Sequence, residues 1–280
     1  ASAGGAGLPA SSLSRPGTGV PVVVVPGLLG SAYSFRKVAA PLAASGFRVV
    51  VVEPLGIGDS ARPERADYSL EAQARRVGVA LDSLRIDSAI VVAHAVGASI
   101  ALRLALQRPG LVRGLVSIEG GIAEAAGTPE LRNALSLARF IGLLGGEGIV
   151  IGKLKDRFAK ASGDPAWASD AVLEAYLAPM REDFGATLQA YRAMADADES
   201  IPLAPRLDHV RFPVHLLRGG AEHEGGVPTA EVEAMRARIA DFREEVVDGA
   251  GLWIQEERPA AVVAAVIRLA LAAFPPRLAI

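Results

Sequence analysis

The chain has 280 residues, a net charge of −2 and no cysteine, and 51% of its residues are hydrophobic. These values predict one large globular domain, or a domain with an insertion, and they exclude disulfides, thiolate metal sites and cysteine nucleophiles. The charge gives no indication of nucleic acid or an acidic membrane surface as a partner. The four histidines lack the spacing of a metal site, so we expect neither a metal nor another cofactor.

Residues 1–19 are mostly small and rich in Gly, Ser and Pro, with no apolar run. This composition predicts a flexible leader, and it is compatible with what remains after removal of a signal peptide. The longest apolar run, residues 260–274, is interrupted by Arg268 and is too short to span a bilayer. We therefore expect a soluble protein without a membrane span, either cytoplasmic or secreted after processing.

From residue 20 onward, six strand-like runs alternate with helical patterns. The runs cover residues 20–25, 47–53, 88–94, 111–119, 212–218 and 243–248, and the first two are rich in β-branched residues. The helical patterns between them cover residues 34–44, 69–84, 96–107, 229–240 and 257–273. Strands separated by helices of this length predict an α/β fold with a doubly wound, mostly parallel sheet.

The alternation is interrupted once, because residues 121–207 carry helical patterns and no credible strand. We predict a core formed by residues 20–120 and 208–280, with residues 121–207 inserted as a helical cap over the carboxyl ends of the strands. Ligands of open α/β sheets bind at that edge. The alternative is a helical satellite that only adds stability.

The segment VVAHAVGAS, residues 91–99, has the outline of a strand, a tight turn and a helix. In many hydrolases the centre of such a turn carries the nucleophilic serine of the pattern G-x-S-x-G. The central residue here is Ala95, which has no oxygen with which to attack a substrate.

Six motifs resemble, in order and spacing, those of the capped, single-domain members of the α/β-hydrolase superfamily. They are VVVVPGLLGS, VVVVEPLGIGDSARPE, VVAHAVGASIALRLALQRP, LVSIEGG, VHLLRGGAEHEGGVP and VVDGAGLWIQEERP, and the resemblance covers residues 21–274. It implies that Ala95 occupies the nucleophile position, Glu222 the acid position and Leu252 the histidine position. Because the nucleophile and the base are both replaced by apolar residues, the triad is degenerate and covalent hydrolysis by the usual route is unavailable.

The resemblance also implies an oxyanion hole formed by the backbone N–H groups of Leu28 and Val96. We predict an apolar pocket bordered by these two residues and by Leu29, Ala95 and Leu252. His94 and Trp253 adjoin it: His94 is more typical of a structural residue, and Trp253 of either a pocket wall or core packing. Ser31 and Ser99 are unconvincing as replacement nucleophiles.

Glu119 ends a predicted strand at a place where some relatives, including many haloalkane dehalogenases, carry the triad acid. If Glu119 and Glu222 face one desolvated cavity, at least one should have a raised pKa and act as an acid or base. The alternative is that either carboxylate is solvated or bonded to loop amides. His223 is a candidate substitute base, although a surface position is the preferred interpretation.

Three functions remain open. The favoured one is a non-hydrolytic enzyme, such as a cyclase, lyase or isomerase, acting on a small apolar oxygenated metabolite. The second is a catalytically dead ligand-binding protein or receptor, as the gibberellin receptors are in this superfamily. The third is a hydrolase with displaced catalytic residues. The sequence makes no prediction of the oligomeric state.

Overall fold

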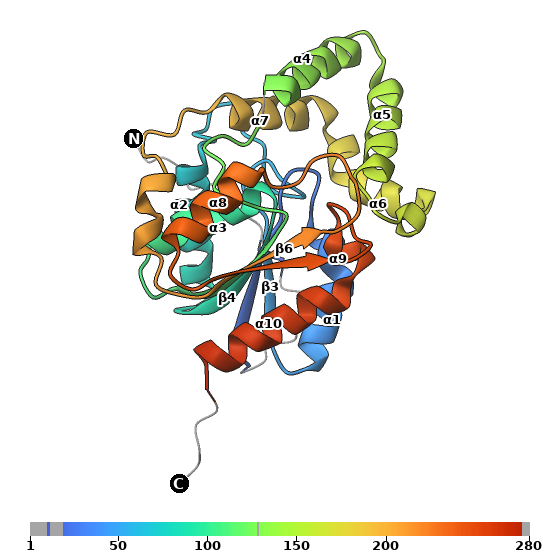
Figure 1. Ribbon diagram of the computed structural model, residues 1–280. Helices are drawn as coiled ribbons and strands as arrows, with labels where there is room; N and C mark the ends of the chain where they lie inside the picture. The colour runs from blue at the N-terminus through green and yellow to red at the C-terminus, as the bar shows by residue number, and fades with distance from the viewer. Residues whose placement is uncertain (1–9, 12–18, 128, 276–280) are drawn as a thin grey trace.

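The structure of the protein, a computed structural model, describes residues 10–11, 19–127 and 129–275 (Figure 1). Most of the predicted leader, residues 1–9 and 12–18, lies outside these ranges. Ala10 and Ser11 form a short strand, β1, that pairs antiparallel with the edge of the sheet. These two residues thus pair with β3 at the edge of the sheet, and the flexible leader of residues 1–19 stays a prediction.

The core is one sheet with the strand order β1-β3-β2-β4-β5-β6-β7, and all its pairings except β1–β3 are parallel. The remaining strands are β2 (Pro21–Val25), β3 (Arg48–Val52), β4 (Ala89–His94), β5 (Val112–Ile118), β6 (Val214–Gly219) and β7 (Phe242–Val247). The central strands are valine-rich and buried because helices cover both faces of a parallel sheet. The predicted fold class and the six predicted strands are confirmed.

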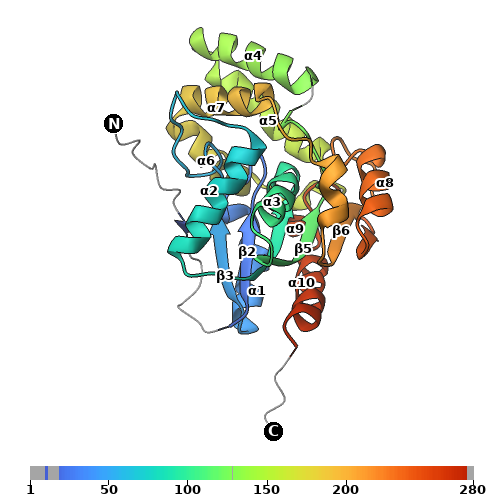
Figure 2. The same ribbon diagram turned by 90° about the vertical axis from the view of Figure 1, so that its left-hand side faces the viewer.

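Two layers of helices enclose the sheet (Figure 2). One layer consists of α1 (Arg36–Ala44), the short α9 (Ile254–Glu257) and α10 (Pro259–Ala273), whose apolar residues share one core cluster with β2 and β3. The other consists of α2 (Leu70–Ser83), α3 (Val96–Gln107) and α8 (Thr229–Arg238), packed in the second cluster. The bounds of α3 agree with the predicted helix of residues 96–107.

Four helices lie between β5 and β6 in the chain: α4 (Pro129–Leu143), α5 (Glu147–Lys160), α6 (Asp170–Glu182) and α7 (Phe184–Asp196). We call them the cap helices, because they lie together over one end of the sheet (Figure 1). The short 3₁₀ helices Pro165–Trp167 and Ala204–His209 complete this stretch, whose described residues include no strand. Within the described ranges, no helix combines the length and apolar content needed to cross a bilayer.

A buried carboxylate on α9 joins the cap helices to the core. Glu256 is 2% exposed and is paired with Arg36 and with Lys37, whose Nζ lies 3.1 Å from Oε2. The hydroxyl of Tyr176 on α6 donates to the same carboxylate at 2.7 Å. Burial next to this negative charge raises the pKa of Tyr176 well above its ordinary value, so the phenol stays protonated as the donor.

Candidate functional site

The turn between β4 and α3 keeps a strained backbone although it carries no nucleophile. Ala95 has φ 48° and ψ −123°, a conformation that residues other than glycine rarely adopt. Its N–H donates to the carbonyl of Ile118 at 2.9 Å, which holds the turn against β5. A side chain at Gly97 would collide with the carbonyl of Val25, so glycine is needed for α3 to begin close to β2. The elbow is therefore built into the fold independently of residue 95.

A cavity of about 220 Å³ lies beside the elbow, and we call it the elbow cavity. The five residues predicted to border a pocket, Leu28, Leu29, Ala95, Val96 and Leu252, all line it. The lining also includes His94, Glu119, Ala126, Arg157, Phe158, Ala161, Glu224, Gly225, Gly226 and Trp253. The predicted site residues thus come together, with the exception of Glu222.

Glu222 is exposed and does not line the elbow cavity. The expectation that Glu119 and Glu222 face the same cavity is therefore wrong. The loop after β6 turns so that Gly225 and Gly226, both with φ 90°, border the cavity instead. Two consecutive residues adopt such conformations at a low cost in free energy only if both are glycine. The pair therefore directs the loop across the site.

His94 is committed to a structural bond. Its Nε2 lies 3.1 Å from the carbonyl oxygen of Leu252, and its ring stacks on Trp253 with centroids 5.0 Å apart. A carbonyl only accepts, so the proton is on Nε2 and the ring is a donor here. Burial lowers the pKa of His94 to about 4, which keeps the ring neutral. These contacts agree with the structural interpretation of His94.

Glu119 lines the elbow cavity with a carboxylate that is already hydrogen-bonded. It is 4% exposed and accepts from the backbone N–H of Gly219, and from that of Val227 at 3.0 Å. Burial raises the pKa of Glu119, while the two backbone donors act in the opposite direction. The direction of this pKa shift is the one expected for a desolvated carboxylate. The two hydrogen bonds, however, agree with the alternative interpretation, in which the carboxylate is bonded to loop amides.

His223 points inward, contrary to the preferred surface interpretation. Its Nδ1 lies 2.8 Å from the carbonyl of Ala221, which assigns the proton of the neutral ring to that nitrogen. Its Nε2 lies 3.9 Å from Oε1 of Glu119, and the side chain is 10% exposed. The two side chains thus lie close together, with Glu119 in the wall of the elbow cavity and His223 outside the lining. Among the residues that the structure describes, no group of three or more His, Asp or Glu side chains is placed to hold a metal ion.

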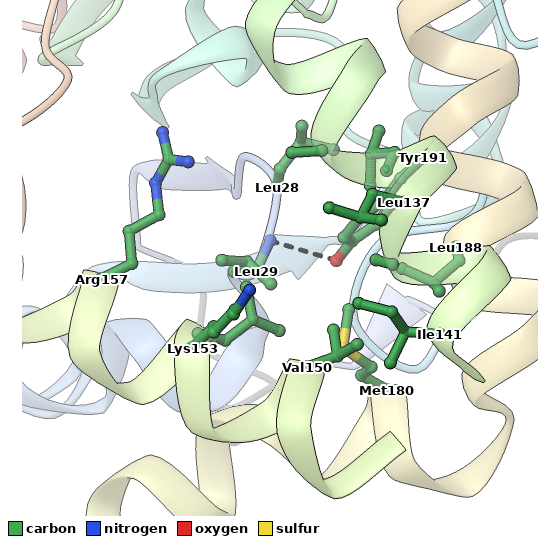
Figure 3. Close-up of a pocket in the computed structure, with 14 residues that line it drawn as sticks. Leu28, Leu29, Leu137, Ile141, Val150, Lys153, Arg157, Met180, Leu188 and Tyr191 are labelled. Carbon is green, nitrogen blue, oxygen red and sulfur yellow. Dashed lines mark hydrogen bonds between the residues drawn. The ribbon is translucent and has the colours of Figure 1, made fainter. Parts of the chain in front are cut away.

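Two backbone donors at the elbow remain free. The N–H groups of Leu28 and Val96 have no hydrogen-bond partner within the described part of the chain. Val96 is the first residue of α3, where the N–H has no carbonyl of its own helix to bond. The N–H of Leu29, by contrast, donates to the hydroxyl of Tyr191 on α7 at 3.1 Å, as Figure 3 shows.

A second, larger cavity of about 370 Å³ lies among the cap helices, and we call it the cap cavity (Figure 3). Its walls are mainly apolar: Leu28, Leu29, Ala134, Leu135, Leu137, Ala138, Ile141, Val150, Leu154, Met180 and Leu188. The polar groups among the lining residues are Tyr191 and two cations one turn apart on α5, Lys153 and Arg157. Leu28, Leu29 and Arg157 also line the elbow cavity, so the two cavities adjoin.

The residues of the cap cavity could not be recognised as such from the apolar pattern of the sequence. Apolar residues on amphipathic helices are equally typical of ordinary core packing, and their pattern does not indicate a hollow. One usable signal was the i, i+4 pair of cations, Lys153 and Arg157, on a helix that also carries Val150 and Leu154. That spacing places both on one side of α5.

Comparison with known proteins agrees with this geometry. Residues 20–139 match the family described as "alpha/beta hydrolase fold". The Mycobacterium tuberculosis protein named "Epoxide hydrolase A" is 27% identical over 89% of this chain and 90% of its own length. The Klebsiella pneumoniae protein named "Putative carbamate hydrolase RutD" is 35% identical, but over only 38% of this chain and 40% of its own length.

Solved structures extend the similarity to nearly the whole chain. An alpha/beta hydrolase fold protein from Burkholderia ambifaria is 28% identical with a TM-score of 0.70, covering 92% of this chain and 93% of its own. Cfl2 from Burkholderia cenocepacia is 25% identical with a TM-score of 0.71, covering 91% and 89%. With its parallel sheet and strained elbow, the chain has the α/β-hydrolase fold, and these similarities support membership of the α/β-hydrolase superfamily.

Proposed function

We propose that this chain is a non-hydrolytic, ligand-binding member of the superfamily, which takes up a small apolar molecule carrying an oxygen atom. The observation that carries the proposal is that the polar side chains nearest the elbow are already hydrogen-bonded to other groups of the protein. His94 donates to Leu252, and Glu119 accepts from two loop amides. Ala95 offers no nucleophile.

The two free N–H groups, of Leu28 and Val96, support binding of an oxygen at the elbow. Backbone donors do not depend on side-chain identity, so they survive the loss of serine and histidine. The adjoining cap cavity, at about 370 Å³, is within the size range of small-molecule sites and has the apolar lining that such sites favour. The oxygen would thus lie at the elbow and the apolar part of the ligand among the cap helices.

We also propose the division into a core of residues 20–120 and 208–280 and a cap of residues 121–207. In this arrangement the cap supplies most of the apolar walls, and the core supplies the two donors. The superfamily relative named an epoxide hydrolase supports a small organic molecule as the ligand class.

The binding proposal is tested by calorimetric titration with 1-decanol. Wild type is expected to bind, and Leu188→Trp, which fills the cap cavity, is expected to weaken binding at least about tenfold. Leu271→Trp is the matched control, because Leu271 is 62% exposed on α10, away from both cavities. Equal binding by all three proteins would refute the cap cavity as the site.

A second candidate is a non-hydrolytic enzyme with Glu119 as acid or base, favoured by its place in the cavity wall and its raised pKa. A third candidate, a hydrolase with displaced residues, is tested by the release of p-nitrophenol from p-nitrophenyl butyrate. We expect no turnover above background. Turnover that is lost in Glu119→Gln but kept in the control Glu222→Gln would replace the binding proposal with a hydrolase that uses Glu119.

A further inference from the structure

The outer side of the cap exposes a cluster of large apolar side chains. Leu137, Phe140, Leu144 and Ile149 are 53%, 61%, 73% and 60% exposed, and they account for four of the eight strongly exposed large hydrophobic residues described. The first three lie at positions i, i+3 and i+7, which places them along one side of α4 and its end. Ile149 follows at the start of α5. We call these four residues the cap edge.

Clustered exposed apolar residues mark an interaction surface more often than scattered ones do. Figures 1 and 2 show α4 as an outermost element of the cap, on the side away from the sheet. The cap edge is therefore accessible to a large, flat partner.

Positive charge is concentrated in the same two helices. Residues 129–160 contain six Lys and Arg but three Asp and Glu, in a chain whose total charge is −2. Lys153, Arg157 and Lys160 follow Ile149 at i+4, i+8 and i+11, so a line of exposed cations continues from the cap edge along α5. None of the three forms an ion pair with the acidic groups that the structure describes. The charge of the whole chain conceals this local excess.

From this combination we propose that the cap edge docks on an anionic lipid surface, with its apolar residues inserted among the headgroups and the cations of α5 on lipid phosphates. Basic residues beside exposed apolar ones are the features by which a helical surface binds a membrane interface without spanning it. A second copy of the chain is disfavoured as the occupant because it would bring two positively charged faces together.

The docking surface is continuous with the cap cavity. Leu137 belongs to the cap edge and also lines that cavity. The cations Lys153 and Arg157, which lie next to the cap edge on α5, line the cavity too. An apolar molecule dissolved in the lipid layer would therefore reach the cavity from the docked face without crossing water. The docking proposal itself does not depend on the identity of that molecule.

The experiment is co-sedimentation of the full chain with vesicles of phosphatidylcholine alone and of an equal mixture of phosphatidylcholine and phosphatidylglycerol. Wild type is expected to bind the mixed vesicles and to bind them less as salt is added. The double variant Phe140→Ser/Leu144→Ser should reduce the partition coefficient roughly tenfold. The matched control, Val79→Ser/Leu271→Ser, removes side chains of 66% and 62% exposure on α2 and α10 and should leave it unchanged.

A second variant tests the charge. Lys160 lines neither cavity. The variant Lys160→Gln should weaken binding to the mixed vesicles by about fivefold without affecting the weak binding to neutral vesicles. Equal binding to the two kinds of vesicle, or binding that survives the Phe140/Leu144 change, would overturn the proposal. The proposal would also be overturned if wild type did not bind vesicles but formed a dimer, measured by light scattering, that the same double variant dissociates. The cap edge would then bind a second copy of the chain.

Discussion

Replacing Ala95 with glycine is expected to stabilise this protein, although glycine usually destabilises. The reason is the backbone at the elbow, where φ 48° and ψ −123° place a residue with a side chain in a region that glycine enters freely. In an active hydrolase of this fold, such strain presents a nucleophile. Here residue 95 is an alanine, whose methyl group cannot act as a nucleophile, so under the proposed binding function the strained backbone has no catalytic role.

The magnitude follows from three contributions. Relief of the strained conformation is worth about 1–3 kcal/mol. Against it stand the larger backbone entropy that glycine loses on folding, roughly 0.5–1 kcal/mol, and the half-buried methyl group, roughly 0.4 kcal/mol as half of a buried CH₂. The free energy of unfolding should therefore rise by about 1 kcal/mol.

The measurement is urea denaturation of wild type, Ala95→Gly and the control Ala178→Gly. Ala178 is exposed within α6, where glycine should cost about 1 kcal/mol through helix propensity alone. The two substitutions are chemically identical, so their opposite signs isolate the backbone conformation at residue 95. If Ala95→Gly were destabilising to the same extent as the control, the strain argument would be refuted.

Three further predictions follow. The double variant Ala95→Ser/Leu252→His should hydrolyse p-nitrophenyl butyrate slowly, and each single variant at least about tenfold more slowly, because triad members act as a unit; equal rates in all three would contradict this. Between pH 6.5 and 4 the folded state binds fewer protons at His94 than the unfolded state does. The free energy of unfolding should thus fall as the pH drops through that window, by roughly 3 kcal/mol from this residue. His94→Gln, compared by denaturant titration at several pH values, should flatten the fall, and an unchanged slope would show that His94 is not its source. Tyr176→Phe should cost roughly 1.5–3 kcal/mol, because a buried charge, Glu256, loses a donor; urea denaturation with an unchanged midpoint would count against that role.

The order of strands and helices could be predicted from the sequence because it depends on local patterns. Valine-rich runs form buried parallel strands wherever helices cover both faces, and the spacing between the runs leaves room only for crossover helices. The position of the elbow follows in the same way, since a strand ending at His94 and a helix beginning at Val96 leave a single residue to make the turn. The five residues predicted to border a pocket are therefore found around one cavity.

The roles of the carboxylates depend on contacts between distant segments, which no local pattern encodes. Glu119 and Glu222 are both candidate acids in the sequence, yet the carboxylate of Glu119 is held by the amides of Gly219 and Val227, and Glu222 is exposed. His223, one residue beyond Glu222, points inward toward Glu119. A shift of one position in an irregular loop reverses the direction of a side chain, and no periodicity records it.

The sequence by itself determined that residue 95, between the strand and the helix of the elbow, is an alanine, and that residue 252 is a leucine. The prediction that the usual covalent route is unavailable rests on these two residues. The tertiary structure decided what remains in its place. Four helices, distant along the chain from the elbow, enclose the cap cavity above Leu28 and Leu29 and leave an apolar edge exposed. Packing between elements depends on the shapes that meet in three dimensions, so a hollow and a filled core arise from the same apolar pattern.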